Sequence, residues 1–244
     1  MSVAVDIKNL TFTYRVLRNR TGSIKELFKE FLHGRVRLVD YTALVDMTFH
    51  VNSGEVFAIV GRNGAGKSTL LKVIAQVLPP TKGSAIVNGS IAPMIELGAG
   101  FHPEMTGAEN VIFYSVLMGR DIKTVKARVN EIGEWAGVSD HMDFPLRAFS
   151  SGMVARLAFS TATDTRSDVL LIDEILSVGD AEFQEKSRNR MRELMSGGAA
   201  AILVTHDMNA VRELAQRAMW IEHGTVKMIG PAAEVAAAYE SSGH

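Results

Sequence analysis

The pattern of hydrophobic and polar positions changes several times along the chain. Apolar and polar residues alternate over 3–14, and strand signals return from Tyr41 up to a short apolar run at 56–60. Two further apolar runs, 169–172 and 200–204, have the length of buried strands and alternate with helical patterns. Because strands buried on both faces and separated by helices are typical of parallel sheets, the pattern predicts an α/β domain with a parallel central sheet.

Capping residues, glycines and prolines mark where the elements between these strands begin and end. Thr106 and Glu109 form a capping box, and Pro79-Pro80 ends an earlier helix. The pair Asn88-Gly89 breaks the stretch from 83 to 97 into short strands, and a hairpin is expected around His223-Gly224. Helices are expected over 67–78, 106–137, from 150 or 151 onward, 181–195 and 208–218, with an Ala-rich final helix.

A segment at about residues 22–34 differs from its surroundings. Ser23 and Glu26 form another capping box, and Gly34 marks the end of the helical pattern. Its apolar side chains fall on one face of a helix: Ile24, Leu27, Phe28, Phe31 and Leu32. The segment is therefore predicted to be a short amphipathic helix inserted between strands.

Composition and charge narrow the possible functions. The 244 residues are 47% hydrophobic and carry a formal net charge of −1, which gives no attraction toward nucleic acids. The chain has no cysteine, so disulfides, thiolate metal sites and thiol catalysis are excluded. The start lacks the pattern of a signal peptide, and no run approaches the ~20 apolar residues of a membrane span. We expect a cytosolic chain that reaches a membrane only through a partner.

The clearest chemical motif lies at residues 61–68. The sequence Gly-Arg-Asn-Gly-Ala-Gly-Lys-Ser matches G-x-x-x-x-G-K-[ST] and stands between a predicted strand and a predicted helix. The glycines allow backbone N–H groups to surround phosphate oxygens, Lys67 is placed for the β- and γ-phosphates, and Ser68 for Mg²⁺. A chance glycine turn would produce this pattern in on the order of one chain in a hundred, so the motif predicts nucleotide binding.

Three more polar residues follow buried strands. Asp173 and Glu174 end the run Leu-Leu-Ile, where Asp173 suits Mg²⁺ and Glu174 suits a general base that activates water. The alternative is an acidic pair at the point where a strand surfaces. His206 follows the strand 200–204, and its alternative is a neighbour of Asp207, a good helix cap. Because carboxyl ends of parallel strands share one edge, His206 is also within reach of a γ-phosphate.

Together, these ordered motifs resemble the ATP-binding subunit of an ABC transporter over essentially the whole chain. The sequence Phe-Ser-Ser-Gly-Met at 149–153 stands where that family has its Leu-Ser-Gly-Gly-Gln signature. The resemblance implies a P-loop ATPase cassette over 1–244, with a parallel core sheet, an antiparallel β lobe and a helical subdomain at about 104–163. It implies a homodimer that binds ATP and Mg²⁺ between two head-to-tail cassettes.

The resemblance also assigns roles to individual residues. Glu174 is the catalytic carboxylate, His206 the switch histidine, and Asp180 a contact to the other cassette. Ser150, Ser151 and Gly152 close on the partner's nucleotide in trans, and the alternative for Ser150 is a plain helix cap. Tyr14 stacks on adenine, or is an ordinary strand aromatic. ATP binding is assigned to Tyr14, Gly61, Arg62, Asn63, Gly64, Ala65, Gly66, Lys67, Ser68 and Thr69, and Mg²⁺ to Ser68, Asp173 and Glu96.

Departures from the family pattern point to a subfamily. Met153 replaces the signature Gln, and Glu96 stands nearest the place of another usual Gln, so it is either a Mg²⁺ or water contact or a structural loop carboxylate. Together with the sequence Glu-Leu-Gly-Ala-Gly-Phe-His-Pro-Glu at 96–104, these features resemble bacterial exporters of lipid-linked polysaccharide. Some members carry a C-terminal carbohydrate-binding domain, which is not expected here.

This resemblance implies a peripheral subunit at the cytoplasmic face of the bacterial inner membrane. Two copies would dock on two copies of a multi-span permease that carries the lipid-linked glycan, with residues 96–101 toward the permease. The inserted helix at 22–34 would lie near that permease or pack on its own domain. The alternatives are an ABC exporter for a drug, lipid or peptide, a soluble ABC ATPase of translation or DNA repair, and a P-loop kinase.

Overall fold

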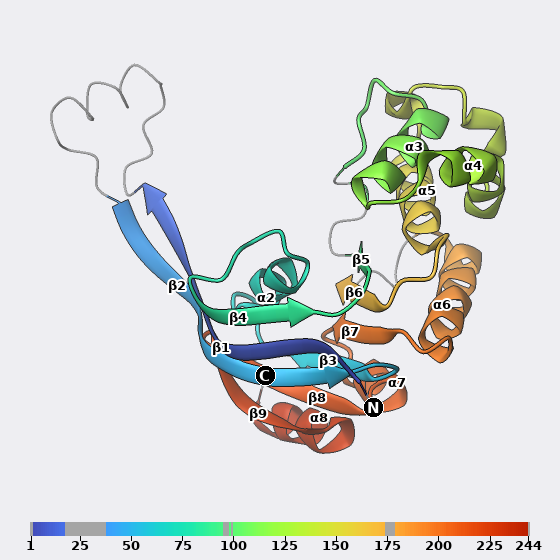
Figure 1. The fold of residues 1–244 in the computed structure, drawn as a ribbon. Helices are drawn as coiled ribbons and strands as arrows, with labels where there is room; N and C mark the ends of the chain where they lie inside the picture. The colour runs from blue at the N-terminus through green and yellow to red at the C-terminus, as the bar shows by residue number, and fades with distance from the viewer. Residues whose placement is uncertain (1, 18–37, 95–97, 99, 174–178, 244) are drawn as a thin grey trace, which may run out of the picture.

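A computed structural model describes residues 2–17, 38–94, 98, 100–173 and 179–243 (Figure 1). It contains an antiparallel sheet, a mixed six-stranded sheet with helices on both faces, and a separate group of helices. The predicted α/β fold with a parallel core sheet, an antiparallel lobe and a helical group is confirmed.

The antiparallel sheet has the strand order β2-β1-β4. Its strands are β1 (Val3–Leu17), β2 (Leu38–Asn52) and β4 (Lys82–Val87). Alternate residues of β1 near its start, Val5 and Ile7, are fully buried because one face of the sheet covers the core. Irregular pairing near Asn9, which has a φ of 47°, shifts the register of the ladder so that Leu10 is also buried.

The six-stranded sheet has the order β5-β6-β7-β3-β8-β9. The first five of these strands are parallel, and β9 pairs antiparallel with β8 at the edge. Every residue of β3 and β7 is buried, as expected for strands covered on both faces. The strands are β3 (Val56–Val60), β5 (Ile91–Met94), β6 (Val169–Asp173), β7 (Ala200–Val204), β8 (Arg217–Glu222) and β9 (Thr225–Pro231).

Helices cover both faces of this sheet. The antiparallel sheet and α2 (Lys67–Ile74) share a hydrophobic core with one face, through residues such as Leu70 and Ile59. The other face is covered by α6, α7 and α8, which contribute residues such as Met191 and Val235. These helices are α6 (Ala181–Ser196), α7 (Met208–Leu214) and α8 (Ala232–Ser241).

Two predicted helix ends were wrong. The helix predicted over 67–78 ends at Ile74, because Gln76 takes a φ of 61° and the N–H groups of Val77 and Leu78 both turn back to the Lys72 carbonyl. The helix predicted over 208–218 ends at Leu214, because residues 217–222 form strand β8, whose residues 217–220 pair with β3. In both places, tertiary or capping contacts override the helical pattern.

The third part is a helical group between β5 and β6 (Figure 1). It contains α3 (Gly107–Leu117), α4 (Ile122–Ala136), α5 (Ser151–Thr163) and two short 3₁₀ helices, Ser139–His141 and Leu146–Ala148. The predicted capping box begins α3: Thr106 Oγ1 accepts the Glu109 N–H, and Glu109 accepts the Thr106 N–H. The group has its own core, which includes Val111, Ile132 and Leu157.

The predicted amphipathic helix at 22–34 lies outside the described residues. Its segment connects Leu17 and Leu38, which are ladder partners at the ends of β1 and β2. Within the described part of the chain, no helix is long and apolar enough to cross a membrane.

Candidate nucleotide site

The loop between β3 and α2 is shaped by three glycines with positive φ. The φ angles are 153° at Gly61, 81° at Gly64 and 107° at Gly66, a region that other residues rarely adopt. A Cβ atom on Gly61 would lie 2.3 Å from the Ile221 carbonyl oxygen, and one on Gly66 would lie 2.9 Å from the Ala43 oxygen. At both positions, the close approach of another backbone excludes a side chain.

Lys67 folds back over this loop. Its side chain is buried, and its Nζ donates to the carbonyl oxygens of Gly61 at 2.6 Å and Arg62 at 3.0 Å. Helix α2 begins at Lys67, and its N-cap, Gly66, supplies no side-chain cap. Backbone N–H groups at the start of α2 and an ammonium group therefore meet at one point, which is a suitable arrangement for phosphate.

The ends of β6 and β7 bring two predicted residues to the same place. Asp173 is the last residue of β6 and pairs with Val204, and His206 follows two residues later. Ser68 Oγ donates to Asp173 Oδ2 at 3.4 Å. With the loop, these side chains line a cavity of about 500 Å³; its lining residues are Tyr41, Ala43, Asn63, Gly64, Gly66, Lys67, Ser68, Thr69, Asp173, Val204 and His206.

Asp207 caps a helix, whereas its neighbour His206 lines the cavity. Asp207 is the N-cap of α7, and its carboxylate accepts the N–H groups of Asn209 and Ala210. His206 is exposed and lines the cavity. Helix capping therefore explains the presence of Asp207 but not that of His206, whose imidazole lies at the cavity.

The donor set around Ser68 and Asp173 fits Mg²⁺. A hydroxyl and a carboxylate are hard oxygen ligands, and Mg²⁺ in nucleotide sites takes few protein ligands beside phosphate oxygens and waters. The Ser68–Asp173 contact already brings both oxygens to the loop that faces the phosphates.

The start of α5 lies apart from this cavity. Ser150 is its N-cap and accepts the Met153 N–H at 3.2 Å, so the capping alternative is present in the structure. Ser151 is exposed, and a Cβ on Gly152 would meet only Ser150 Oγ, at 3.9 Å. Ser150, Ser151 and Gly152 do not line the cavity formed by the loop of the same chain.

Asp180 begins α6 as its N-cap. Its Oδ1 accepts the Phe183 N–H at 2.9 Å, and its Oδ2 lies 3.8 Å from Arg156 Nη1 on α5. The Asp180 side chain is 66% exposed, which leaves room for a further contact.

The two tyrosines that face each other across β1 and β2 have different surroundings. Tyr14 and Tyr41 are ladder partners, but Tyr41 lines the cavity at the loop, whereas Tyr14 lines a second cavity. The Tyr14 hydroxyl is 3.3 Å from Thr69 Oγ1. Tyr41 was missed in the sequence because it lies at the start of a strand pattern with no motif around it.

In a comparison with family models, residues 44–177 match the model described as ABC transporter. The chain belongs to the ABC transporter family. The cassette is thus the ATP-binding, ATP-hydrolysing subunit of such a transporter.

The cassette is also similar to curated proteins over its whole length. It is 38% identical to the O-antigen export system ATP-binding protein RfbB of Klebsiella pneumoniae, over 99% of each chain. It is 32% identical to the teichoic acids export ATP-binding protein TagH of Listeria innocua, over 98% of the cassette and 70% of TagH. Among solved structures, a dimeric ATP-binding cassette in a post-hydrolysis state with ADP and phosphate matches with a TM-score of 0.72, at 21% identity over 93% of this chain and 98% of that one. This last likeness bears on the fold alone.

Two predicted residues of the cassette lie outside the described part of the chain. They are Glu174, directly after Asp173, and Glu96, after β5. Their roles as catalytic carboxylate and metal or water contact stay predictions.

Proposed function

We propose that this cassette powers the export of a lipid-linked polysaccharide across the bacterial inner membrane. The part of the proposal that concerns ATP rests on one observation. Side chains from α2, the end of β6 and the connection after β7 line one cavity: Lys67, Ser68, Asp173 and His206. The cargo is inferred from relatives, named for O-antigen and teichoic acid export, that match the cassette over nearly its full length.

Within one cassette, each predicted residue has a distinct task. The N–H groups of the loop and the Lys67 ammonium bind the β- and γ-phosphates. Ser68 and Asp173 would hold Mg²⁺, which would supply positive charge to those phosphates. Glu174 accepts a proton from the attacking water, and His206 contacts the γ-phosphate. When nucleotide enters, Lys67 exchanges the Gly61 and Arg62 carbonyls for phosphate oxygens.

The other half of each ATP site comes from a second copy. The exposed start of α5, with Ser150, Ser151 and Gly152, offers small side chains and helix N–H groups that suit close approach to an anion. The exposed Asp180 would contact the same partner. ATP favours the closed dimer only as far as it binds that state more tightly than the open one, so both half-sites are needed.

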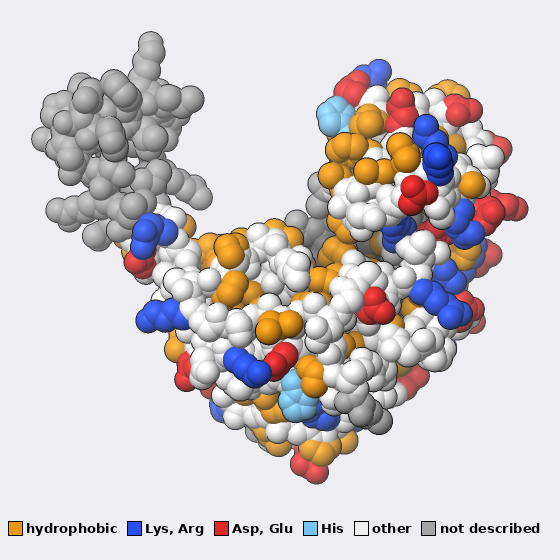
Figure 2. Space-filling model, viewed as in Figure 1, with side chains coloured by type: hydrophobic (Ala, Val, Ile, Leu, Met, Phe, Trp, Pro, Cys, Tyr) orange, Lys and Arg blue, Asp and Glu red, His pale blue; other side chains and the backbone are white. Residues whose placement is uncertain are grey.

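An apolar groove between α2 and α3 is our candidate surface for the permease. A cavity of about 490 Å³ lies there, lined by side chains that include Leu78, Tyr114 and Met118. On its rim, Val77 is 67% exposed and Leu117 is 58% exposed, so the apolar surface of the groove continues onto the outside of the molecule. Figure 2 shows hydrophobic side chains facing the hollow between the helical group and the rest of the molecule.

In this arrangement, the cassette is a peripheral subunit at the cytoplasmic face of the membrane. Two copies would dock on two copies of a multi-span permease, and residues 96–101 and the predicted helix at 22–34 would lie toward it. The permease, not the cassette, would contact the lipid-linked glycan.

The decisive experiment is to deplete the cassette in its source cells and measure polyprenol-linked glycan. We expect lipid-linked polymer to accumulate inside the cells and surface polymer to fall. Wild-type cassette should restore export, and Lys67→Ala should not, because it removes the phosphate-binding ammonium.

The control separates the ATPase from its cargo. Purified wild-type cassette should hydrolyse ATP, whereas Lys67→Ala should lose at least about 100-fold in rate. If ATPase is present but depletion leaves intracellular and surface glycan unchanged, the polysaccharide proposal fails, and a drug, lipid or peptide exporter takes its place.

A further inference from the structure

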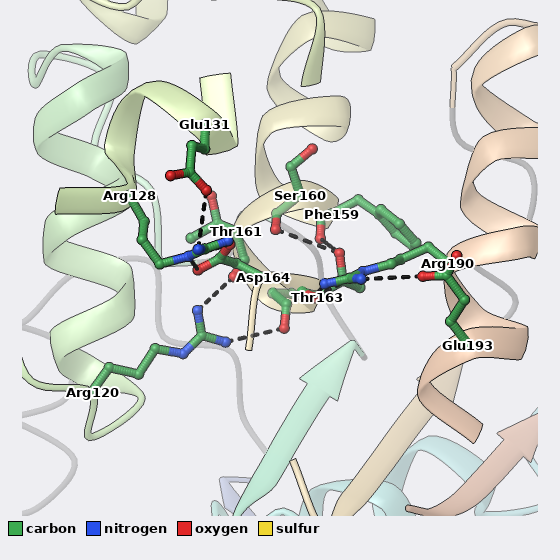
Figure 3. A network of polar contacts seen from close by, with 11 residues as sticks. Arg120, Arg128, Glu131, Phe159, Ser160, Thr161, Thr163, Asp164, Arg190 and Glu193 are labelled. Atoms are coloured by element: carbon green, nitrogen blue, oxygen red, sulfur yellow. Dashed lines mark hydrogen bonds and ion pairs between the residues drawn. The ribbon is translucent and has the colours of Figure 1, made fainter. Parts of the chain in front are cut away.

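The C-terminus of α5 is held by three arginines from three segments of the chain, the α3–α4 connection, α4 and α6 (Figure 3). This helix begins with the exposed residues Ser150 and Ser151 and ends at Thr163, with Asp164 as its C-cap. The last carbonyls of a helix have no partner within the helix and carry partial negative charge, so cations bind there. The family motifs do not include any of these arginines.

Arg120 holds the end of α5 from within the helical group. It lies just after α3, and its Nη1 and Nη2 donate to the carbonyl oxygens of Thr161 at 2.7 Å and Ala162 at 3.1 Å. Burial lowers the pKa of the Arg120 guanidinium, but an arginine remains charged in proteins.

Arg128 neutralises Asp164, the acidic C-cap of this helix. From α4, it makes a forked contact with Asp164, with Nε to Oδ2 at 2.9 Å and Nη2 to Oδ1 at 2.7 Å. A carboxylate next to a helix C-terminus is unfavourable, and this pairing removes the conflict. Arg120 and Arg128 therefore join α5 to α3 and α4 of its own group.

Arg190 differs because it comes from outside the helical group, from the part of the molecule that contains the six-stranded sheet. It lies on α6, which packs on the central sheet through Met191 and Leu194. Its Nη2 and Nε donate to the Thr163 carbonyl oxygen at 2.7 and 3.2 Å, and Glu193 holds its Nη1 at 3.2 Å. Arg190 is therefore a direct polar link between the end of α5 and the body that contains the ATP loop.

Helix α6 also contacts α5 at two points nearer the start of α6. Asp180 lies 3.8 Å from Arg156, and the Phe183 ring packs on Phe159. Together with the Arg190–Thr163 contact, these give three contacts along the pair of helices. The two helices thus lie side by side over the second half of α5, and the first half extends beyond this contact. A cavity of about 290 Å³ lies between the end of α5 and β5, and its lining includes Arg120, Arg128 and Ile91.

The length of α5 makes its angle important. Its 13 residues span about 20 Å, so a tilt of about 3° at the C-terminus moves the start by about 1 Å. Phosphate contacts act over hydrogen-bond distances, and a displacement of about 1 Å is enough to reduce catalysis strongly.

We propose that Arg190 is a positioning residue, which sets the angle of α5 relative to the sheet and so the place where Ser150–Gly152 meets the partner's nucleotide. This proposal rests on the proposed head-to-tail dimer. Arg190 touches no nucleotide, and acts through the Thr163 carbonyl.

The test compares Arg190→Ala with Arg120→Ala. Both variants remove a guanidinium from the same helix end, but only Arg190 joins the two bodies. Both variants are made in a Glu174→Gln background, and Mg-ATP-dependent dimerisation is measured. The dimer affinity should fall about tenfold for Arg190→Ala and less than about twofold for Arg120→Ala. The affinity of the monomer for a fluorescent ATP analogue should stay within about twofold for both variants. If an Ala variant fails to fold, Arg190→Lys and Arg120→Lys, which keep the charge and lose the fork, replace the pair.

The distance between a spin label on the helical group and one on α8 provides a second readout. A general loss of stability would not change this distance in the folded protein. Because the chain has no cysteine, spin labels can be attached only where they are introduced, at Lys126→Cys on α4 and Glu234→Cys on α8, both exposed. Arg190→Ala should broaden or shift the label-to-label distance distribution of the monomer, and Arg120→Ala should not.

Equal effects of the two arginines on dimerisation, or unchanged distances in the Arg190 variant, would overturn the proposal and leave Arg190 as a helix cap. The parent Glu174→Gln protein separates this result from failure of the dimer itself. If the parent does not dimerise with Mg-ATP, the proposed dimer is wrong. The label-to-label distances in the monomer still test the other part of the proposal: altered distances in Arg190→Ala mean that Arg190 sets the angle of α5, and unchanged distances mean that it does not.

Discussion

Two helix starts in this cassette are suited to phosphate, and they are built in opposite ways. The start of α2 has a glycine cap, no capping side chain and close backbone neighbours at Gly61 and Gly66. The start of α5 is capped by the Ser150 hydroxyl and has open space around Gly152. The first start is enclosed by other backbone segments, whereas the second is exposed and has its own side-chain cap.

In the proposed dimer, each ATP site would combine these two kinds of helix start, one from each copy. The loop must already be in place before nucleotide binds, because its backbone makes the contacts itself. The start of α5 would approach and leave the partner's nucleotide in each cycle. Substitutions at the two starts should therefore fail in different ways.

The largest contrast is expected between Gly61→Ala and Gly152→Ala. A methyl group at Gly61 would meet the Ile221 carbonyl at 2.3 Å in a backbone conformation that alanine rarely adopts. We expect Gly61→Ala to lower the free energy of unfolding by about 3 kcal/mol, measured by urea denaturation.

Gly152→Ala is the matched control for that variant. Its methyl group finds open space and a normal backbone, so the free energy of unfolding should change by less than about 0.5 kcal/mol. Similar destabilisation by both substitutions would contradict the proposed contrast between the two helix starts.

Tyr41→Ala and Tyr14→Ala test which of the two tyrosine rings contributes to ATP binding. Because Tyr41 lines the loop cavity and Tyr14 lines the other one, we expect Tyr41→Ala to weaken ATP binding more, by about tenfold, as loss of one stacked ring permits. Titration of a fluorescent ATP analogue measures both. A larger loss with Tyr14→Ala would instead favour the residue assigned by the family resemblance.

Ser150→Ala should have a smaller effect on folding than on assembly. Loss of the cap to the Met153 N–H should cost about 1 kcal/mol of stability, seen as a small decrease in melting temperature. ATP-dependent dimerisation in the Glu174→Gln background should decrease as well, whereas ATP binding by the monomer should not. A decrease in monomer binding would argue against a role in trans.

The smallest effect is expected at a third helix start, that of α3, which has no phosphate role. Hydrogen bonds from Thr106 lower the pKa of the Glu109 carboxyl below its ordinary value. Its stabilising contribution is therefore present above the unfolded pKa, about 4.3, and is lost as the pH falls through the folded pKa. Melting temperatures measured between pH 7 and 3 should decrease less steeply for Glu109→Gln than for the wild type; parallel curves would contradict this assignment.

The fold and the loop were predictable because their signals are local in the sequence. Residues 61–68 encode their own geometry through glycine, and the capping box at Thr106 and Glu109 was also recognised correctly. The end of α2 was missed because Gln76 takes a positive φ without being glycine or asparagine.

Contacts between distant segments were not predictable in the same way. Tyr41 and Tyr14 have the same residue type on paired strands, and only the register and the surrounding side chains decide which one lines the cavity. Likewise, Arg190 is one of several polar residues on α6, and its contact with Thr163 joins positions 27 apart in the chain. Such residues carry no motif, because their function depends on where the fold brings them.

The pairing of Leu17 with Leu38 has a consequence for how this cassette can be altered by evolution or by engineering. The ladder between β1 and β2 brings both ends of the intervening segment together, so the chain entropy of closing that loop is largely met by the sheet. Lengthening or exchanging the segment therefore costs little more in loop entropy. The junction at Leu38 nevertheless lies three residues before Tyr41, which lines the loop cavity, and five before Ala43, whose carbonyl oxygen lies beside Gly66. The length and sequence of the segment can thus vary at small cost to the fold, whereas a change that disturbs the first residues of β2 would also reach the cavity.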